Sequence, residues 1–257
     1  VYVWSDALVN YLTAVGFPNP GYEQWWPASL HLVGKDIIKF HCIIWPAMLM
    51  SAGLPLPEQV FGHGFFTVAE QKISKSLGNA IAPNVITEKY GIDGLRYYLL
   101  RDIPFGQDGE FSFDRLHSVY HADLANELGN LVQRTASMIT KYLGGKTGPL
   151  EAHAHDASRY HEAMAGLRFD RALEDVWERV KGLNQMIEEE KPWVLAKEDT
   201  EHLAEVLKHV VSDLLQISSL LLPFMPDAAV KIAQTFADGV IHPEVGILFP
   251  RIEDKIA

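Results

Sequence analysis

The hydrophobic pattern of the second half of the chain restricts the possible folds more than any other feature. From Leu116 onward, apolar residues recur every three or four positions, which places them on one face of an α-helix. Breaks at Gly144-Gly145, Pro192, and Pro223 with Pro226 separate successive helices. Residues 116–257 are therefore predicted to form an antiparallel α-helical bundle, with an extended tail over 246–252. The apolar runs are Leu116, Val119, Leu124, Leu128 and Leu131; Leu173, Val176, Trp177, Val180 and Leu183; and Leu203, Val206, Leu207, Val210, Leu214, Ile217 and Leu221.

Residues 1–78 have a different pattern, in which strands and helices alternate. Strands are predicted over residues 1–4, 30–33 and 60–68, the last interrupted by Gly62-His63-Gly64, and helices are predicted after Asp6 and after Gly34. Asp6 and Asp36 each stand where a strand gives way to a helix, so both are predicted N-caps. This part of the chain is expected to be α/β.

Residues 79–115 are punctuated by Pro and Gly and are predicted to form a small connecting module. Within it, short helices are expected over 84–90 and 93–101. The whole chain is thus predicted to be α/β followed by all-α, in three parts: 1–78, 79–115 and 116–257.

Charge and cysteine content limit the possible partners. The net charge is −11, with 22 basic and 33 acidic residues, so the molecule as a whole repels a polyanion and any nucleic-acid binding must be local. Residues 116–257 are also acidic, with 14 Lys and Arg against 22 Asp and Glu. The single cysteine, Cys42, excludes an internal disulfide and a cysteine-rich zinc site; it is expected to be buried and inert in a reducing compartment. No apolar run is long enough to predict a membrane span.

A lysine-rich loop carries the first chemical signal. Its sequence, Lys72-Ile73-Ser74-Lys75-Ser76, combines two flexible point charges with neutral hydroxyl donors, and Gly78 follows it. This composition suits an anion such as a pyrophosphate leaving group. A solvated turn that happens to carry two lysines is the alternative, and composition alone favours it.

The loop resembles the signature Lys-Met-Ser-Lys-Ser of class I aminoacyl-tRNA synthetases at four of five positions, with Ile73 in place of Met. The resemblance implies a Rossmann-type nucleotide-binding domain, of which residues 1–78 would be the C-terminal half. It also implies that Lys72 and Lys75, with Ser74 and Ser76, stabilise the attack of an amino-acid carboxylate on ATP. ATP is expected as a substrate with Mg2+, and no structural zinc is expected in this segment.

Two further segments resemble the methionyl member of that class, one from Val1 to Tyr11 and one from Gly34 to Trp45. The resemblance implies a methionine pocket, and the spacing of its residues is consistent with two helix faces, since Ala7 and Tyr11 are four apart and Ile37, His41 and Trp45 are successive fourth residues. Ordinary core packing of Ile37 and Trp45 is the alternative. The implied methionine-binding residues are Trp4, Ala7, Tyr11, Ile37, His41 and Trp45.

The nucleotide site is implied at the end of the second predicted strand, where ligands of α/β sheets bind. Gly34 and Asp36 would hold the ATP ribose, although Asp36 could instead serve only as an N-cap. His63 and Phe66, with the backbone of Phe65, would border the adenine, and Lys75 would contact ATP; a purely structural role for His63 is an equal alternative.

A polar stripe in the bundle has the composition of an RNA-reading surface. Asn126, Asn130 and Arg134 are successive fourth residues, and Trp193 follows a helix-stopping Pro192. Amides, arginine and an aromatic ring read unstacked bases by hydrogen bonding and stacking. The family resemblance assigns Asn130, Arg134 and Trp193 to the anticodon; a surface pair and a packed loop are the alternative.

The resemblance implies a methionine–tRNA ligase acting on methionine, ATP and tRNA(Met), with a stem-contact module over 79–115 and the anticodon domain over 116–257. The chain opens on Val1, so it is expected to begin within a longer protein and to lack the half with the His-Ile-Gly-His motif, leaving the fragment alone inactive. A monomer in the cytoplasm, or alternatively the mitochondrial matrix, is expected. A non-catalytic tRNA-binding protein and a synthetase for another aliphatic amino acid are the competing hypotheses.

Overall fold

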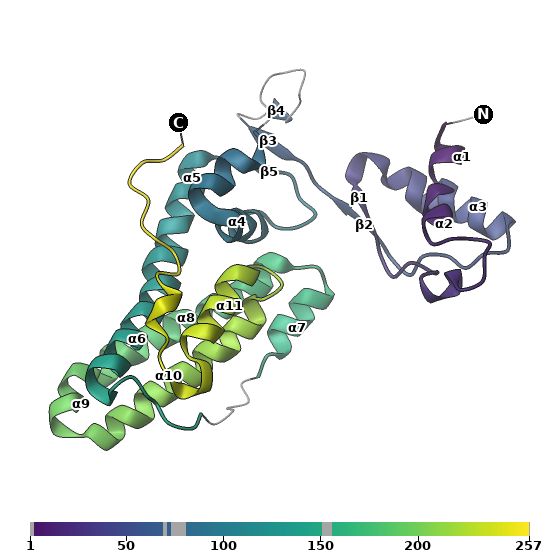
Figure 1. The fold of residues 1–257 in the computed structure, drawn as a ribbon. Coiled ribbons are helices and arrows are strands. Elements are labelled where there is room, and N and C mark those ends of the chain that lie inside the picture. Colours follow the sequence, from purple (N-terminus) through teal and green to yellow (C-terminus); the bar gives the residue numbers. More distant parts are fainter. Residues whose placement is uncertain (1–2, 69–70, 73–80, 151–155, 257) are drawn as a thin grey trace. The chain divides into compact units, whose positions relative to one another are not determined.

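The computed structural model describes residues 3–68, 71–72, 81–150 and 156–256. The chain divides into two compact units (Figure 1). The first comprises Val1–Lys72 together with Phe105–Gly109, and the second comprises Ile73–Pro104 and Glu110–Ala257.

The first unit begins with helices. These are α1 (Val3–Ala7) and α2 (Asn10–Ala14), followed by a 3-10 turn, Tyr22–Gln24. The strand predicted over residues 1–4 is wrong for the described part, since Val3 and Trp4 are helical, and Asp6 lies inside α1 rather than capping it. Trp4, Leu8 and Leu12 are four residues apart and pack into one apolar core, so burial of this stripe overrides the β-propensity of Val and Trp.

The strands predicted over residues 30–33 and 60–68 are present, and they pair in parallel. β1 (His31–Gly34) pairs with β2 (Val60–His63), with Gly34 opposite His63. A helical segment joins the strands, consisting of a 3-10 turn at Lys35–Ile37, a π-helix at Phe40–Ile44 and α3 (Trp45–Ser51). Its cap residue is Gly34, without a side-chain cap hydrogen bond, so the predicted N-cap role of Asp36 is wrong.

The third predicted strand is broken in two at Gly64-Phe65. Beyond β2, the strand β3 (Phe66–Val68) lies between β4 (Gln71–Lys72) and β5 (Gly109–Glu110) in a second small sheet. The backbone at Gly64 approaches a distant segment so closely that a Cβ there would lie 2.1 Å from the Gln107 carbonyl oxygen. The break therefore lets a later part of the chain join this sheet.

The second unit is helical. It starts with α4 (Pro83–Arg101), in which Gly91 has φ 73° and divides two helical stretches at the predicted place. A long helical run follows, made of α5 (Phe113–Val119), a π-helix at Tyr120–Gly129 and α6 (Asn130–Leu143). The remaining helices are α7 (Ser158–Ala165), α8 (Phe169–Glu190), α9 (Pro192–Glu198), α10 (Thr200–Leu221) and α11 (Pro226–Thr235).

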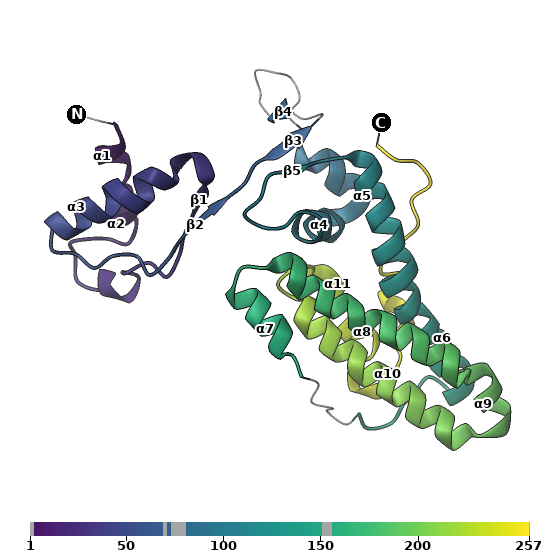
Figure 2. The same ribbon diagram turned by 180° about the vertical axis from the view of Figure 1, so that it is seen from behind.

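The helical character predicted for residues 116–257 is confirmed. The apolar residues that recur at helical spacing in α8 and α10 are buried. These two helices run alongside each other in both views (Figures 1 and 2). Two 3-10 turns follow α11, at Ala237–Gly239 and Pro243–Val245, and residues 246–252 form no helix or strand. Within the described ranges, no helix has the length and apolar character needed to cross a membrane.

Candidate functional site

Four of the predicted pocket residues come together in an aromatic cluster of the first unit. The Tyr11 hydroxyl lies 2.8 Å from His41 Nε2, and His41 Nδ1 lies 3.0 Å from the Ile37 carbonyl oxygen. Because a carbonyl oxygen only accepts, His41 Nδ1 carries a proton. In that tautomer of the uncharged ring, Nε2 is free to accept from the Tyr11 hydroxyl. Burial raises the pKa of Tyr11, which keeps it a donor. His41 is thereby fixed in one tautomer and one orientation.

Aromatic contacts extend this cluster on both sides. Trp4 stacks on Phe40 with ring centroids 4.3 Å apart and meets the His41 ring edge-on at 6.2 Å. Tyr11 and the buried Trp45 lie 6.0 Å apart. Ile37 packs on the same core half-buried, whereas Ala7 is exposed and is not part of the cluster. The cluster is thus built from four helical elements, each of which supplies at least one aromatic or histidine side chain: α1, α2, the π-helix between the strands, and α3.

Two residues that the sequence reasoning missed also belong here. The Trp45 indole N–H donates to His31 Nε2 at 3.2 Å, and Trp26 meets Trp45 edge-on at 5.9 Å. Burial, and second the neighbouring His41, lower the pKa of His31, so this ring is held neutral. The alternation of β1 was the available signal, since His31 shares its inward face with Val33 while Leu32 is exposed.

The proposed nucleotide residues lie at the carboxyl ends of the two parallel strands. Gly34 is the last residue of β1 and is paired with His63, the last residue of β2. Asp36 is exposed, and a Cβ at Gly34 would lie 2.8 Å from its Oδ1, so only glycine there leaves the carboxylate its place. His63 Nδ1 lies 2.8 Å from the Gly64 carbonyl oxygen, and Phe66 is exposed at the start of β3. Backbone pairing therefore brings Gly34, Asp36 and His63 to one sheet edge.

The lysine loop is described only at its start. Lys72 is the last residue of β4 and is paired with Thr67 of β3. Ser74, Lys75 and Ser76 lie outside the described residues.

Cys42 differs from expectation. It is exposed rather than buried, because it lies on the π-helix turn whose inward positions are taken by Phe40 and His41. In the described part of the chain, no group of three or more His, Cys, Asp and Glu residues gathers to hold a metal ion.

In the second unit, two of the predicted RNA-contact residues line one cavity. Arg134 of α6 and Trp193 of α9 border a space of about 310 Å³. Arg134 Nη2 also forms an ion pair with Glu188 Oε1 at 2.6 Å. The side chains that complete the lining are Gln133, Ser137, Met138, Lys141 and Tyr142.

The two asparagines of the predicted stripe do not line that cavity. Asn130 is exposed at the first position of α6. Asn126 lies in the preceding π-helix and its Oδ1 accepts from Arg251 at 3.1 Å. A π-helix has more residues per turn than an α-helix, so the spacing of four no longer stacks Asn126 over Asn130 and Arg134.

The backbone between α8 and α9 sets the position of Trp193. Lys191 adopts a left-handed conformation with φ 48° and ends α8, and Pro192 follows as the buried first residue of α9. Trp193 is left 40 % exposed beside the cavity. A non-glycine residue in this conformation is uncommon, and such positions cluster at binding sites.

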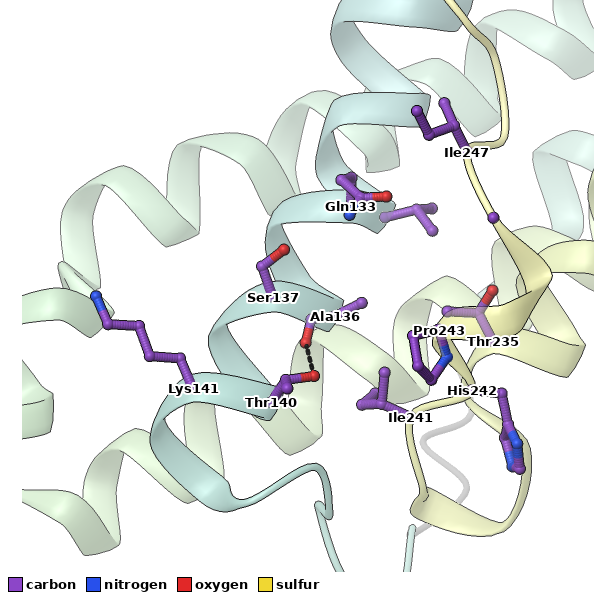
Figure 3. A pocket seen from close by; sticks show the side chains of 12 residues that line it. Gln133, Ala136, Ser137, Thr140, Lys141, Thr235, Ile241, His242, Pro243 and Ile247 are labelled. Carbon is purple, nitrogen blue, oxygen red and sulfur yellow. Dashed lines mark hydrogen bonds between the residues drawn. The ribbon is translucent and has the colours of Figure 1, made fainter.

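A second cavity is also lined by residues of α6 (Figure 3). It measures about 470 Å³ and its opposite wall is the segment after α11, with Ile241, Pro243 and Ile247. Gln133, Ser137 and Lys141 border both cavities. Helix α6 therefore presents two hydrogen-bonding side chains and one cation to both cavities.

Comparison with known proteins gives consistent matches. The family model described as "tRNA synthetases class I (M)" matches residues 1–136. Methionine–tRNA ligase of Thermotoga maritima is 46% identical over 246 residues, covering 90% of this chain and 39% of the relative. That of Caldanaerobacter subterraneus subsp. tengcongensis is 44% identical over 286 residues, covering 98% and 45%. The chain thus spans less than half the length of these relatives.

A solved structure is similar over nearly the whole chain. Mycobacterium tuberculosis methionyl-tRNA synthetase in complex with methionyl-adenylate superposes with a TM-score of 0.85 at 37% sequence identity. The match covers 97% of this chain and 56% of that one. The fold is therefore that of a class I synthetase over both units.

Proposed function

The chain belongs to the class I methionyl-tRNA synthetase family, and on that premise we propose that it forms part of a methionine–tRNA ligase. Such an enzyme activates methionine with ATP and transfers it to tRNA(Met). The observation that carries the proposal is the aromatic cluster in which Tyr11 and His41 are joined by a hydrogen bond beside Trp4 and Trp45.

The cluster suits a methionine side chain. A thioether is unbranched and polarizable, and each contact between sulfur and an aromatic ring is favourable by about 0.3–1.5 kcal/mol. Tyr11 and His41 satisfy each other's polar atoms, so the wall that they form is largely apolar. Ile37 completes it, while Ala7, being exposed outside the cluster, is the weakest of the proposed methionine contacts.

ATP would bind along the sheet edge next to this cluster. The Asp36 carboxylate would accept hydrogen bonds from the ribose hydroxyls beside Gly34, and His63 and Phe66 would border the adenine. ATP would arrive as its Mg2+ complex. Lys72 and Lys75, with Ser74 and Ser76, would stabilise the negative charge that develops on the pyrophosphate.

The RNA partner would meet the second unit. Stacking of an unpaired base on Trp193, with hydrogen bonds from Arg134 and Asn130, is the proposed recognition of the anticodon. We place the contact with the tRNA stem on the module of residues 79–115.

Methionine-dependent exchange of pyrophosphate into ATP tests the catalytic proposal, measured with the intact protein that contains this sequence. The change Tyr11→Phe removes the hydrogen-bond donor to the buried His41. Leaving a buried polar group without its partner costs about 1–3 kcal/mol of free energy. If this cost falls on the bound state, kcat/KM for methionine should fall at least about fivefold.

Tyr160→Phe is the matched control, because it removes a buried tyrosine hydrogen bond of 2.7 Å to Leu220 in the second unit. It should leave kcat/KM unchanged. Exchange that depends on leucine instead of methionine would contradict the substrate assignment. A protein that binds tRNA(Met) without any exchange would favour the non-catalytic alternative.

The RNA proposal is tested by the affinity for tRNA(Met). Truncation of a stacking aromatic costs about 1–3 kcal/mol per base, so Trp193→Ala should weaken binding by about 5- to 150-fold. Trp25→Ala is the control, since Trp25 is an exposed tryptophan of the first unit. Equal affinities of the Trp193→Ala protein and the wild type would contradict the anticodon role.

A further inference from the structure

A short segment from far along the chain completes the first unit. Phe105–Gly109 packs with Val1–Lys72, although the 32 residues between Lys72 and Phe105 belong to the second unit. The Phe105 ring stacks on Phe61 of β2 with centroids 4.9 Å apart and planes 3° from parallel. The Gly109 N–H donates to the Phe65 carbonyl oxygen at 3.0 Å.

Asp108 is the charged residue of this segment, and its two carboxylate oxygens reach two different loops. Oδ1 accepts from the Phe65 N–H at 2.7 Å. Oδ2 forms an ion pair with Lys35 Nζ, which also lies over the Phe65 ring at 5.4 Å from its centroid. Lys35 stands between Gly34 and Asp36, and Phe65 stands between His63 and Phe66. Asp108 thus connects the ribose loop to the adenine border.

The same segment supports the strand that leads to the lysine loop. Gly109 lies along one edge of β3, and β4 lies along the other, with Lys72 paired to Thr67. The backbones of Gly64 and Gln107 also lie close together, since a Cβ at Gly64 would be only 2.1 Å from the Gln107 carbonyl oxygen.

Stability alone does not account for this arrangement. Both side chains of the Lys35–Asp108 pair are 47% exposed, and an exposed pair contributes little to the free energy of folding. Its effect falls instead on the relative placement of two loops that carry the proposed ATP residues. Small misplacements of such groups lower rates steeply.

We infer that Asp108 is a positioning residue for ATP, holding Lys35 and the Phe65 N–H so that the Gly34–Asp36 loop and the adenine border face the nucleotide together. The inference rests on the proposed function. It concerns ATP and not methionine, because none of the residues that Asp108 contacts in the described hydrogen bonds belongs to the aromatic cluster.

Steady-state pyrophosphate exchange with the intact protein tests this role. Asp108→Ala should lower kcat/KM for ATP by about 10- to 100-fold while the KM for methionine stays within about twofold. Asp108→Asn should fall between, because its amide oxygen still accepts from the Phe65 N–H while the ion pair is lost. Asp108→Glu should restore part of the loss by re-forming the pair with Lys35.

Asp114→Asn is the matched control, since Asp114 forms an exposed ion pair with Lys255 in the second unit. It should leave both KM values unchanged. An Asp108→Ala protein with wild-type kcat/KM for ATP would overturn the inference. A parallel loss for ATP and methionine, accompanied by a lower Tm, would overturn it in favour of a structural role.

Failure of the proposed function is distinguished by calorimetric titration with Mg-ATP alone. A wild type without exchange activity contradicts the ligase proposal. In that case, a larger Kd for ATP in Asp108→Ala than in Asp114→Asn still supports the role of Asp108 in positioning ATP. Equal Kd values of the two variants overturn that role.

Discussion

At the scale of single residues, the neutral state of His31 makes the aromatic cluster sensitive to acid. His31 Nε2 accepts from Trp45, which only the unprotonated ring can do, and burial lowers its pKa below the ordinary 6.5. A lowered histidine pKa gives stability that is present above pH 6.5 and is lost as the pH falls below it.

We therefore expect the free energy of unfolding of the wild type to decrease below pH 6.5 more steeply than that of His31→Gln. Glutamine keeps an acceptor for the Trp45 N–H but does not titrate. Denaturant unfolding between pH 5 and 8 measures the difference. Parallel pH profiles of the two proteins would contradict this assignment.

The Arg134–Glu188 ion pair sets a second prediction at this scale. The pair joins a proposed RNA-contact residue to an acidic neighbour, so RNA binding must compete with it. An exposed pair contributes about 0–1 kcal/mol, so Glu188→Gln should raise the affinity for tRNA(Met) by up to about fivefold. Glu178→Gln, which breaks the exposed Arg159–Glu178 pair, is the control and should leave affinity unchanged. A reduced affinity of Glu188→Gln would show that the pair helps to orient Arg134.

Residue patterns predicted some neighbours and not others. The juxtaposition of Tyr11 and His41 follows from two helical spacings together with the family resemblance. His31 and Asp108 were missed because their hydrogen-bond partners lie on other segments of the chain. The local sequence pattern around each residue does not show which distant segment it contacts. Cys42 was wrongly expected to be buried, since side-chain type predicts burial only on average.

At the scale of elements, α11 is capped from a distant helix. The carboxylate of Asp93 on α4 accepts from the Ala228 N–H at 2.6 Å, and Asp93 is buried. Its Oδ1 has no hydrogen-bond partner among the residues that the structure describes. Burial is the main cause that raises the pKa of Asp93 above 3.8, and the charge of Asp227 adds to it. The hydrogen bond from the Ala228 N–H, and then the charges of Arg96 and Lys231, act in the opposite direction. A raised carboxyl pKa means that its stabilising effect is greatest below pH 3.8 and declines as the pH rises through the folded-state value.

Asp93→Asn should therefore gain stability relative to the wild type as the pH rises from about 4 toward 7, because the amide keeps an acceptor without a buried charge. Thermal unfolding of both proteins across that range measures the difference. A difference in Tm that does not change with pH would contradict the raised pKa.

The break between β2 and β3 supports a prediction on packing. A Cβ at Gly64 would meet the Gln107 carbonyl oxygen at 2.1 Å, so Gly64→Ala must push the two backbones apart. We expect a loss of about 1–3 kcal/mol in the free energy of unfolding, measured by denaturant titration. Gly182→Ala is the control, because a Cβ there meets no atom of the described residues within 4 Å and alanine favours the helix α8. Equal stabilities of the two variants would contradict the close approach.

Helices were predictable where a long apolar stripe is buried, as in α8 and α10. The wrong predictions of secondary structure and capping fall in short segments, whose conformation depends on packing against neighbouring segments. Trp4 is helical because it packs with Leu8 and Leu12, and the capping expected of Asp6 and Asp36 fails because the helices begin before them. Local propensity decides little in segments of four or five residues.

At the scale of the whole molecule, composition and contacts divide the chain differently. The sequence pattern changes from α/β to loop-rich near residue 78, whereas the first compact unit ends at Lys72. The later segment Phe105–Gly109 also belongs to the first unit. Sequence patterns predicted the order of the α/β and helical parts. They did not predict that this later segment belongs to the first unit, because five residues without periodicity give no signal.

The acidic balance of the molecule sets the salt dependence of RNA binding. With a net charge of −11, affinity must come from a few local cations such as Arg134 and Lys141. The slope of log affinity against log salt should then be shallow, at roughly −1 to −3. Lys141→Ala should make it shallower by about 0.7, as measured by filter binding between 50 and 300 mM salt. A steep slope that Lys141→Ala leaves unchanged would point to another basic surface.

The first unit can be completed during synthesis only after Phe105–Gly109 has been translated, because this segment belongs to it. At about 5–20 residues per second, the 37 residues from Ile73 to Gly109 take roughly 2–7 s to synthesise. Throughout that interval β3 has no β5 beside it, and its open edge is available to other nascent chains. A cluster of slowly translated codons just before position 105 would prolong the exposure, so rapid decoding of this stretch would favour soluble product.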